Sequence, residues 1–384
     1  MELIGKELFA ESPGDGVAGL GYCWYVGREG VDMEAIFATQ TRSDTNDRRW
    51  RRWSSDNGRT WGDPEEIEFI RKDSEGTHRV YAHPGRVDPF TGRLIRFSNR
   101  VCLPTDQPSE GASRWAIWYE VSLDKGRSYG DAKPVTGSGR MLGDQTCVPI
   151  FMPDGEMLVP FQMAELAEDG SLFQPYDTPF YQSRIAIGRW QDETTLTWEI
   201  SECARLSPDY TTRGAFEPTI ARVPDGRILM VLRGSNMRKT ELPGYRWHAV
   251  SHDNGRTWGE VRQWMFDDGT PFFSPSSCSQ LLLHSGGRLL WIGNITGENP
   301  DGNLPRYPIV IGEVDQRSLV LKKETVVVID DVGPGESPRT CLSNFHAYED
   351  RETSEIVMCM PRWRARSKEK LDWTTDSYRY GIRV

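Results

Sequence analysis

The chain has 384 residues, and its 37 Gly, 24 Pro and 14 Trp are typical of many short strands joined by tight turns. Its formal net charge of −10 argues against nucleic acid as a partner, because nucleic-acid-binding proteins favour a basic surface. No apolar run is long enough to cross a bilayer, so we expect no membrane insertion, and no signal peptide is evident. The seven Cys show no zinc-type spacing, so we expect a reduced chain in the cytoplasm.

A hairpin pattern recurs in chain order: an apolar run, a tight turn and a second apolar run. Its turns lie at residues 88–92, 153–155, 224–226 and 285–287, with two weaker copies at residues 27–30 and 350–353. Asp-Gly between two β-prone runs, as at Asp225-Gly226, is a strong hairpin signal. Five turn glycines follow one another at intervals of 62, 63, 71 and 61 residues. Because such intervals are typical of propellers and solenoids, the sequence predicts six copies of one unit.

A second pattern, S-x-D-x-G-x-[ST]-[WY], follows three of the hairpins, at residues 54–61, 122–129 and 251–258. The Asp carboxylate can accept backbone N–H groups and close a turn, Gly supplies positive φ, and the aromatic ring can pack between neighbouring units. These turns resemble the Asp-boxes (BNR repeats) of the sialidase, or neuraminidase, superfamily. The resemblance implies an all-β, six-bladed β-propeller with four-stranded antiparallel blades. We expect one domain over residues 1–384, with the N-terminal strand completing the last blade beside residues 378–384.

In a propeller, equivalent positions on the inner strands converge on one central funnel, so the repeat phase selects candidate ligand-binding residues. A polar residue stands at the equivalent position in each repeat, at the end of the second strand of the hairpin: Gln40, Asn99, Gln162, Arg233, Asn294 and Arg362. Nine residues before the turn glycine, the phase places His83 and Glu217, with Asp144 beside the equivalent position in the third copy. A carboxylate held among apolar strands suits general acid or base work. A structural role for each residue is the alternative.

The sialidase resemblance assigns further roles. The segment Phe216-Glu217-Pro218 resembles the family's glutamate, which activates a tyrosine nucleophile. Arg233 resembles the second, and Arg306 the third, member of the family's carboxylate-binding arginine triad. The segment Thr41-Arg42-Ser43-Asp44 resembles the place of a substrate-binding arginine, Arg42, followed by an acid/base aspartate, which would be Asp44 or Asp47.

Two departures from the family pattern stand out. Residues 18–24, where the family has the first triad arginine, contain none, and Arg362 would have to substitute for it. Residues 343–346, where the tyrosine nucleophile is expected, read Ser-Asn-Phe-His. We therefore expect chemistry based on carboxylates and not on a tyrosine.

The expected function is that of a glycosidase of sialidase-like type, exo-acting on an anionic glycan in the funnel. Glu217 with Asp44 or Asp144 would form the carboxyl pair, and arginines would bind the anionic group. Two alternatives stay open: a polysaccharide lyase, in which His83 or a tyrosine abstracts a proton from a uronate, and a non-catalytic sugar-binding propeller. The six His show no metal-ligand spacing, so we expect neither a metal nor another cofactor.

Overall fold

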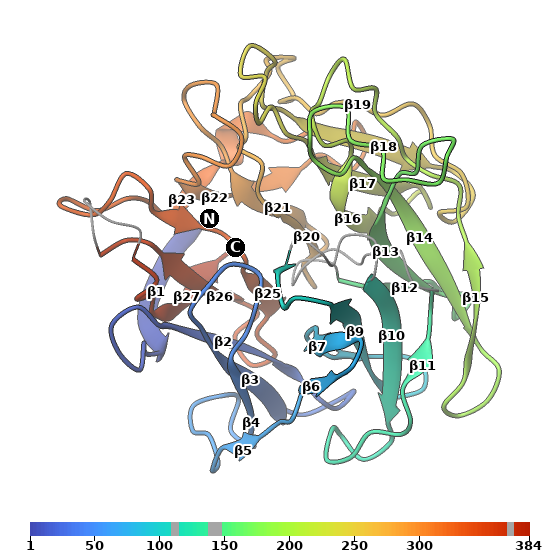
Figure 1. Ribbon diagram of the computed structural model, residues 1–384, viewed down its shortest axis with the longest axis vertical. Helices are drawn as coiled ribbons and strands as arrows, with labels where there is room; N and C mark the ends of the chain where they lie inside the picture. Colours follow the sequence, from blue (N-terminus) through green and yellow to red (C-terminus); the bar gives the residue numbers. More distant parts are fainter. Residues whose placement is uncertain (109–114, 137–147, 367–371) are drawn as a thin grey trace.

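The structure is a computed structural model that describes residues 1–108, 115–136, 148–366 and 372–384. Six antiparallel sheets stand around a central axis as the blades of a propeller (Figure 1). The all-β, six-bladed fold predicted from the repeat is confirmed. In the described part of the chain, helical structure is limited to the 3-10 helix η2 (Lys323–Thr325), and no helix there is long and apolar enough to span a membrane.

Four blades contain four strands each, in chain order from the axis to the outer rim (Figure 1). Blade 1 consists of β2 (Ala18–Tyr25), β3 (Met33–Gln40), β4 (Arg48–Ser54) and β5 (Glu65–Glu66). Blade 3 consists of β12 (Ile150–Phe151), β13 (Met157–Ala164), β14 (Tyr181–Trp190) and β15 (Leu196–Ile200). Blade 4 consists of β16 (Phe216–Arg222), β17 (Ile228–Arg233), β18 (Arg246–Ser251) and β19 (Arg262–Gln263). Blade 5 consists of β20 (Gln280–Leu283), β21 (Leu289–Asn294), β22 (Ile309–Val314) and β23 (Val327–Asp330).

The other two blades have an innermost strand that is split into two segments. Blade 2 consists of β6 (Ile70–Asp73), β7 (Gly76–Ala82), β8 (Arg86–Val87), β9 (Leu94–Leu103), β10 (Trp115–Ser122) and β11 (Lys133–Pro134). In this blade β7 and β8 both pair with β9, and β6 adds one more strand beside β7. Blade 6 consists of β24 (Cys341–Leu342), β25 (His346–Glu349), β26 (Ile356–Trp363), β27 (Ser377–Arg383) and β1 (Glu2–Ala10), with β24 and β25 both paired to β26.

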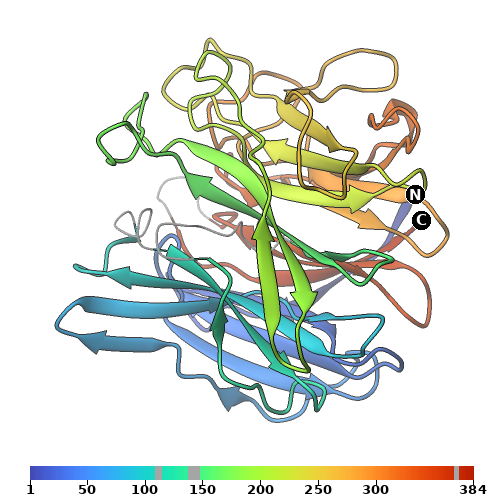
Figure 2. The same ribbon diagram turned by 90° about the vertical axis from the view of Figure 1, so that its right-hand side faces the viewer.

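The ring is closed by the N-terminal strand. β1 pairs antiparallel with β27, with Leu3 opposite Ile382 and Leu8 opposite Tyr378. The two ends of the chain therefore lie close together (Figure 2). The predicted completion of the last blade by the first strand is confirmed, and it joins the two ends of the ring by a ladder of main-chain hydrogen bonds.

The hairpin turns have the backbone that their sequences predict. The five turn glycines, Gly30, Gly92, Gly155, Gly226 and Gly287, all have φ between 75° and 93°. An L-residue with a side chain rarely adopts this left-handed conformation, so glycine is the residue that lets each apolar run fold back on the next. In the sixth copy, Ser354 takes the same role with φ 58°.

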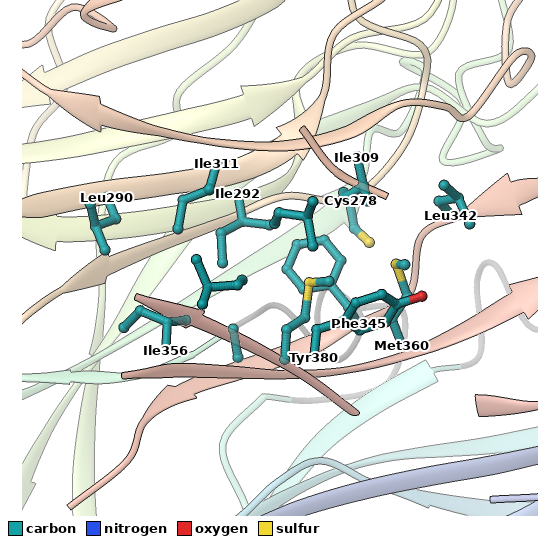
Figure 3. Packing of buried hydrophobic residues seen from close by; sticks show 14 residues of the cluster. Cys278, Leu290, Ile292, Ile309, Ile311, Leu342, Phe345, Ile356, Met360 and Tyr380 are labelled. Atoms are coloured by element: carbon teal, nitrogen blue, oxygen red, sulfur yellow. The ribbon is translucent and has the colours of Figure 1, made fainter. Parts of the chain in front are cut away.

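The hydrophobic core lies between adjacent blades. The largest cluster fills the space between blades 5 and 6, where Ile292, Ile311 and Leu290 meet Phe345, Met360 and Tyr380 (Figure 3). All of these side chains are buried. Because each blade buries its two faces against its neighbours, packing fixes the inner strands and the side chains at their ends relative to the axis.

The Asp-box-like turns join the third and fourth strands of blades 1, 2 and 4. In blade 4, the Asp253 carboxylate accepts hydrogen bonds from the Thr257 N–H at 2.9 Å, the Thr257 hydroxyl at 2.6 Å and the Ser251 hydroxyl at 2.7 Å. The Ser251 hydroxyl in turn accepts the Gly255 N–H at 2.9 Å. Asp56 and Asp124 make the same set of bonds in the other two blades. These carboxylates close turns at the rim, as the pattern predicted.

Candidate functional site

A cavity of about 640 Å³ lies at the centre of the ring, because its lining residues come from all six blades. Its described wall carries two carboxylates, Asp44 and Glu217, and five arginines, which are Arg49, Arg213, Arg233, Arg306 and Arg364. Gln162, Glu217 and Arg233 belong to different blades or strands, and they meet in this cavity as the repeat phase predicted. The excess of positive charge favours an anionic ligand.

Glu217 stands at an irregular point at the start of β16. The pairing of β16 with β17 shifts register between Phe216 and Thr219, and Glu217 has φ 45°. Gln162 of blade 3 accepts the Glu217 N–H at 2.6 Å and so holds this backbone in place. A non-glycine residue held in the left-handed region costs about 1–3 kcal/mol and is found preferentially at functional sites. Glu217 lines the cavity at this irregular point of the backbone.

Arg233, at the end of β17, holds one oxygen of the Glu217 carboxylate in a direct ion pair. The Arg233 guanidinium also donates to the Ser276 hydroxyl at 2.8 Å and to the Asn303 side-chain oxygen at 3.1 Å, and it lies over the Phe216 ring. Both members of the pair are largely buried, with side chains 7% and 12% exposed. The second oxygen of Glu217 is buried and has no hydrogen-bond partner among the described residues.

Three further arginines surround this ion pair. Burial, followed by the positive charge of Arg233, lowers the pKa of Arg213 and of Arg306. The same causes lower the pKa of the fully buried Arg246 to about 9. Among the described residues, Glu217 is the one carboxylate that forms an ion pair with any of these four arginines. The group therefore carries positive charge that no described residue neutralises, and an anion in the cavity would relieve their mutual repulsion.

Asp44 lies on the loop between β3 and β4, with φ 56°, and its side chain accepts the Ser43 hydroxyl at 2.9 Å. This loop is tied to blade 2 through Asp106. The Asp106 carboxylate accepts from Arg42 at 2.8 Å and from Arg79 at 2.8 Å, and Arg79 also donates to the Asn46 carbonyl at 2.9 Å. Arg79 is buried, so the tie anchors the Asp44 loop to the blade wall.

The blade 2 side of the cavity is aromatic and polar. The Tyr81 ring stacks on the Trp115 ring with centroids 5.7 Å apart and planes 14° apart. Burial raises the pKa of Tyr81 to about 12. His83 and Asn99 line the same wall and are both buried. Flat aromatic faces beside hydrogen-bonding groups are suited to the apolar faces and hydroxyls of a sugar.

Not every residue selected by the sequence reaches the cavity. Asn294 instead donates to the carbonyls of Pro308 and Leu342, both at 3.1 Å, and joins blades 5 and 6. The Arg362 guanidinium pairs with Asp330 and Glu336, which belong to blade 5 and the loop after it. Arg42 is engaged by Asp106. These three side chains turn to neighbouring blades or loops, and Asp144 lies outside the described residues.

The structure also shows cavity residues that the sequence reasoning missed: Arg49, Arg213, Arg364, Tyr81 and Trp115. The Arg and Trp residues at 48–53 predict a strand with one solvated face and give no sign of a cavity residue. The Arg49 side chain is nevertheless buried and donates to the carbonyls of Val80 and Ala82. Arg213 lies four residues before Glu217, and this closeness is the signal that could have drawn attention to it.

The position expected for a tyrosine nucleophile is occupied by Asn344, which lines the cavity with φ 60°. The Asn344 carbonyl accepts the Tyr22 hydroxyl at 2.8 Å. Tyr348, four residues further on, is buried in the core with its hydroxyl 3.4 Å from the Cys23 sulfur. Tyr348 is therefore not part of the described cavity wall.

The propeller and its cavity define the fold class of the sialidase-like six-bladed β-propellers. The chain belongs to the BNR repeat-like domain family, which it matches over residues 105–331. No curated protein matches its sequence.

Solved structures of glycosidases share the fold. A NanB sialidase from Streptococcus pneumoniae superposes with a TM-score of 0.64 at 11% identity, over 98% of this chain and 70% of that chain. An α-L-arabinanase from Penicillium chrysogenum gives 0.57 at 13% identity, over 100% and 98%. An α-L-arabinofuranosidase from Fusarium graminearum gives 0.57 at 12% identity, over 98% and 97%. At these identities the likeness concerns the fold.

Proposed function

We propose that this protein is a glycoside hydrolase that removes a terminal residue from an anionic glycan bound in the central cavity. The observation that carries the proposal is the group of Arg213, Arg233 and Arg306 around the single carboxylate of Glu217. Guanidinium groups bind carboxylate or sulfate groups through paired hydrogen bonds. An acidic sugar would supply the negative charge that this group lacks.

Glu217 and Asp44 form the proposed carboxyl pair. Arg233 fixes one oxygen of Glu217. The other oxygen is buried without a hydrogen-bond partner among the described residues, and in the proposed reaction this oxygen attacks the bound sugar or activates water once the Glu217 side chain turns toward it. Asp44 is exposed on a loop at the cavity wall, where it can exchange protons with solvent and protonate the leaving group. The tie from Asp106 to Arg42 and Arg79 keeps this loop in position.

Elimination is the second candidate, because His83 and Tyr81 line the same cavity. In a lyase, one of them would remove the proton next to a uronate carboxylate while arginines neutralise that carboxylate. The raised pKa of Tyr81 makes its ionised form scarce at neutral pH, so a Tyr81 base is disfavoured. We therefore place hydrolysis first.

The test is a panel of aryl glycosides that pairs acidic sugars, such as a sialoside and a glucuronide, with neutral sugars, such as an arabinofuranoside and a rhamnoside. We expect release of the aryl group from an acidic substrate. Release from neutral substrates alone would contradict the anionic assignment. A product with new ultraviolet absorption from a uronate polymer would establish elimination, and binding of an acidic sugar without turnover would establish a sugar-binding protein.

The stereochemistry of the product follows from the same assay. If Glu217 attacks the sugar directly, the first product anomer keeps the configuration of the substrate. If Glu217 activates water, the configuration is inverted. Proton NMR of the first turnovers separates the two outcomes.

A further inference from the structure

A second cluster of reactive side chains lies on blade 2, outside the cavity. One ligand atom from each of Glu75, His78 and Cys102 lies within 4.8 Å of the others. The Cys102 sulfur is 3.9 Å from the His78 Nε2 atom, and the same Nε2 atom is 2.9 Å from an oxygen of Asp73. None of these four residues is among the cavity-lining residues.

The strand pairing explains why these residues meet. β6 and β7 form a hairpin whose turn runs from Asp73 to Gly76, and His78 on β7 stands directly opposite Cys102 on β9. Gly76 has φ 139°, and a Cβ atom at that position would lie 2.5 Å from the Leu103 carbonyl oxygen. The glycine therefore lets the turn lie against the end of β9. Because the four residues come from a turn and two strands, their spacing matches no metal motif, and the sequence carries no signal for the cluster.

We propose that Glu75, His78 and Cys102, with Asp73 as the fourth ligand, form a binding site for a zinc ion. A thiolate, an imidazole and carboxylates are the donors that zinc takes in proteins. Around a tetrahedral zinc, with bonds of about 2.3 Å to sulfur and 2.0 Å to nitrogen, those two atoms are about 3.5 Å apart. The distance of 3.9 Å between the Cys102 sulfur and His78 Nε2 needs only a small adjustment to reach this value.

Binding of zinc would replace the hydrogen bond between Asp73 and His78, since both groups would turn their lone pairs to the metal. The Cys102 thiol would lose its proton to solvent, because the thiolate is the form that binds zinc. His78 and Asp73 are partly exposed, with side chains 25% and 29% accessible, so an ion can reach them without opening the blade.

The site would act as a clip and not as a catalytic centre. Four protein ligands fill a tetrahedral zinc and leave no open position for a substrate. The ion would join the β6–β7 turn to the end of β9, which leads directly into the segment with Asp106. We therefore expect zinc to stabilise this side of the ring. This proposal does not depend on the proposed glycosidase activity.

Cobalt provides the decisive test, because Co²⁺ in a site with a thiolate gives a sulfur-to-metal charge-transfer absorption. Wild-type protein, prepared reduced and metal-free, is titrated with Co²⁺ and then with Zn²⁺ in competition with a chromophoric chelator. We expect one equivalent of metal, a charge-transfer band, and displacement of Co²⁺ by Zn²⁺. Absence of the band in the wild type, or no zinc binding at micromolar concentration, would overturn the proposal.

Two variants and a control assign the site. Cys102→Ser should abolish the charge-transfer band and weaken zinc binding by about tenfold or more, and His78→Ala should weaken it to a similar extent. Cys203→Ser is the matched control, because Cys203 is another free, partly buried cysteine far from the cluster in the sequence. If Cys102→Ser fails to fold, His78→Ala decides the matter. A band that survives in Cys102→Ser, or unchanged zinc affinity in His78→Ala, would contradict the site.

Thermal unfolding gives a readout that does not depend on absorption. A saturating concentration of zinc should raise the Tm of the wild type and of Cys203→Ser, because the ion binds the folded chain. The same concentration of zinc should raise the Tm of Cys102→Ser and His78→Ala by clearly less, because both variants bind the ion more weakly. An equal rise in all four proteins would show that zinc binds elsewhere.

Discussion

Two of the carboxylates of blade 4 are used in opposite ways. Asp253, in the turn between β18 and β19, is exposed and takes all its hydrogen bonds from residues within four positions of itself. Glu217, on β16, is largely buried, and its partners are Gln162 from blade 3 and Arg233 from β17. The first carboxylate is satisfied by its own turn, whereas one oxygen of the second has no partner among the described residues.

The difference separates structural from functional use of the same chemistry. A carboxylate that accepts hydrogen bonds from its own turn stabilises local structure and needs no ligand. A carboxylate in a strained backbone, surrounded by more arginines than it can neutralise, is poorly explained by stability alone. Changes at the turn should therefore affect the free energy of unfolding, and changes in the cavity should affect ligand binding and turnover.

The largest effect is expected for Glu217→Gln. The amide keeps the shape of the side chain but cannot act as a base or a nucleophile, so kcat/KM on an acidic aryl glycoside should fall by about 10²–10⁴-fold. The Tm should also fall, because the arginine group loses its one carboxylate. Activity is therefore measured at a temperature where circular dichroism shows the variant to be folded.

The matched control for this change is Glu168→Gln, since Glu168 is an exposed glutamate on the loop after β13. Its activity and stability should equal those of the wild type. Turnover by Glu217→Gln at the wild-type rate would remove Glu217 from the mechanism and, with it, the proposed use of the irregular β16 backbone.

A smaller effect is expected for Arg213→Gln. Arg233 is already engaged by Glu217, Ser276 and Asn303, whereas no ion pair of Arg213 is found within the described chain. Loss of a charged hydrogen bond to the ligand should raise KM on an acidic substrate by about 10–100-fold, which corresponds to roughly 1.5–3 kcal/mol. Inhibition by a neutral sugar should not change. Arg262→Gln, on the exposed rim, is the control. An unchanged KM would end the role of Arg213 in anion binding.

The loop that carries Asp44 is held by the ion pairs of Asp106 with Arg42 and Arg79. These contacts are structural, but because they position Asp44, their loss should affect turnover. Asp106→Asn removes the charge that holds Arg42 and Arg79 and should lower kcat by about tenfold or more, since misplacement of a reacting group by 1 Å can cost 10²-fold. KM should change little. Asp177→Asn breaks an ion pair on an exposed loop and is the control. A change in KM alone would assign Asp106 to the ligand and not to the loop.

The fold could be predicted from the sequence because its determinants are local and repeated. Each turn glycine and each rim turn closed by aspartate can be recognised from a stretch of about eight residues. The near-constant interval between the copies then predicts inner strands arranged around one axis. Asn99, Gln162 and Arg233, which were predicted from equivalent positions in the repeat to line the funnel, do lie at the cavity wall.

The rest of the cavity could not be predicted. The position of a residue in the repeat indicates where its strand ends, but not the direction in which the last side chain of that strand points. Asn294 and Arg362 have the same phase as Arg233, yet they satisfy carbonyls and carboxylates of neighbouring segments. Arg49 belongs to a third strand, and Arg213 and Asp106 to loops, where the repeat has no fixed position. Their places depend on packing between blades.

The smallest effect is expected at the rim turn, for Asp253→Ala. The hydrogen bonds of this exposed turn are worth about 1 kcal/mol of unfolding free energy, and kcat/KM should not change. Burial by itself would raise the pKa of Asp253, but the hydrogen bonds from Thr257 and Ser251 outweigh it and lower the pKa to about 2. Because the folded pKa is below the unfolded value of about 4, the stabilisation is present above pH 4 and is lost as the pH falls toward 2. Urea unfolding at pH 7 and at pH 3 should therefore show a difference between wild type and variant that shrinks at the lower pH. A constant difference, or a folded variant without activity, would show that the rim turn and the cavity are not separate in the way that blade 4 indicates.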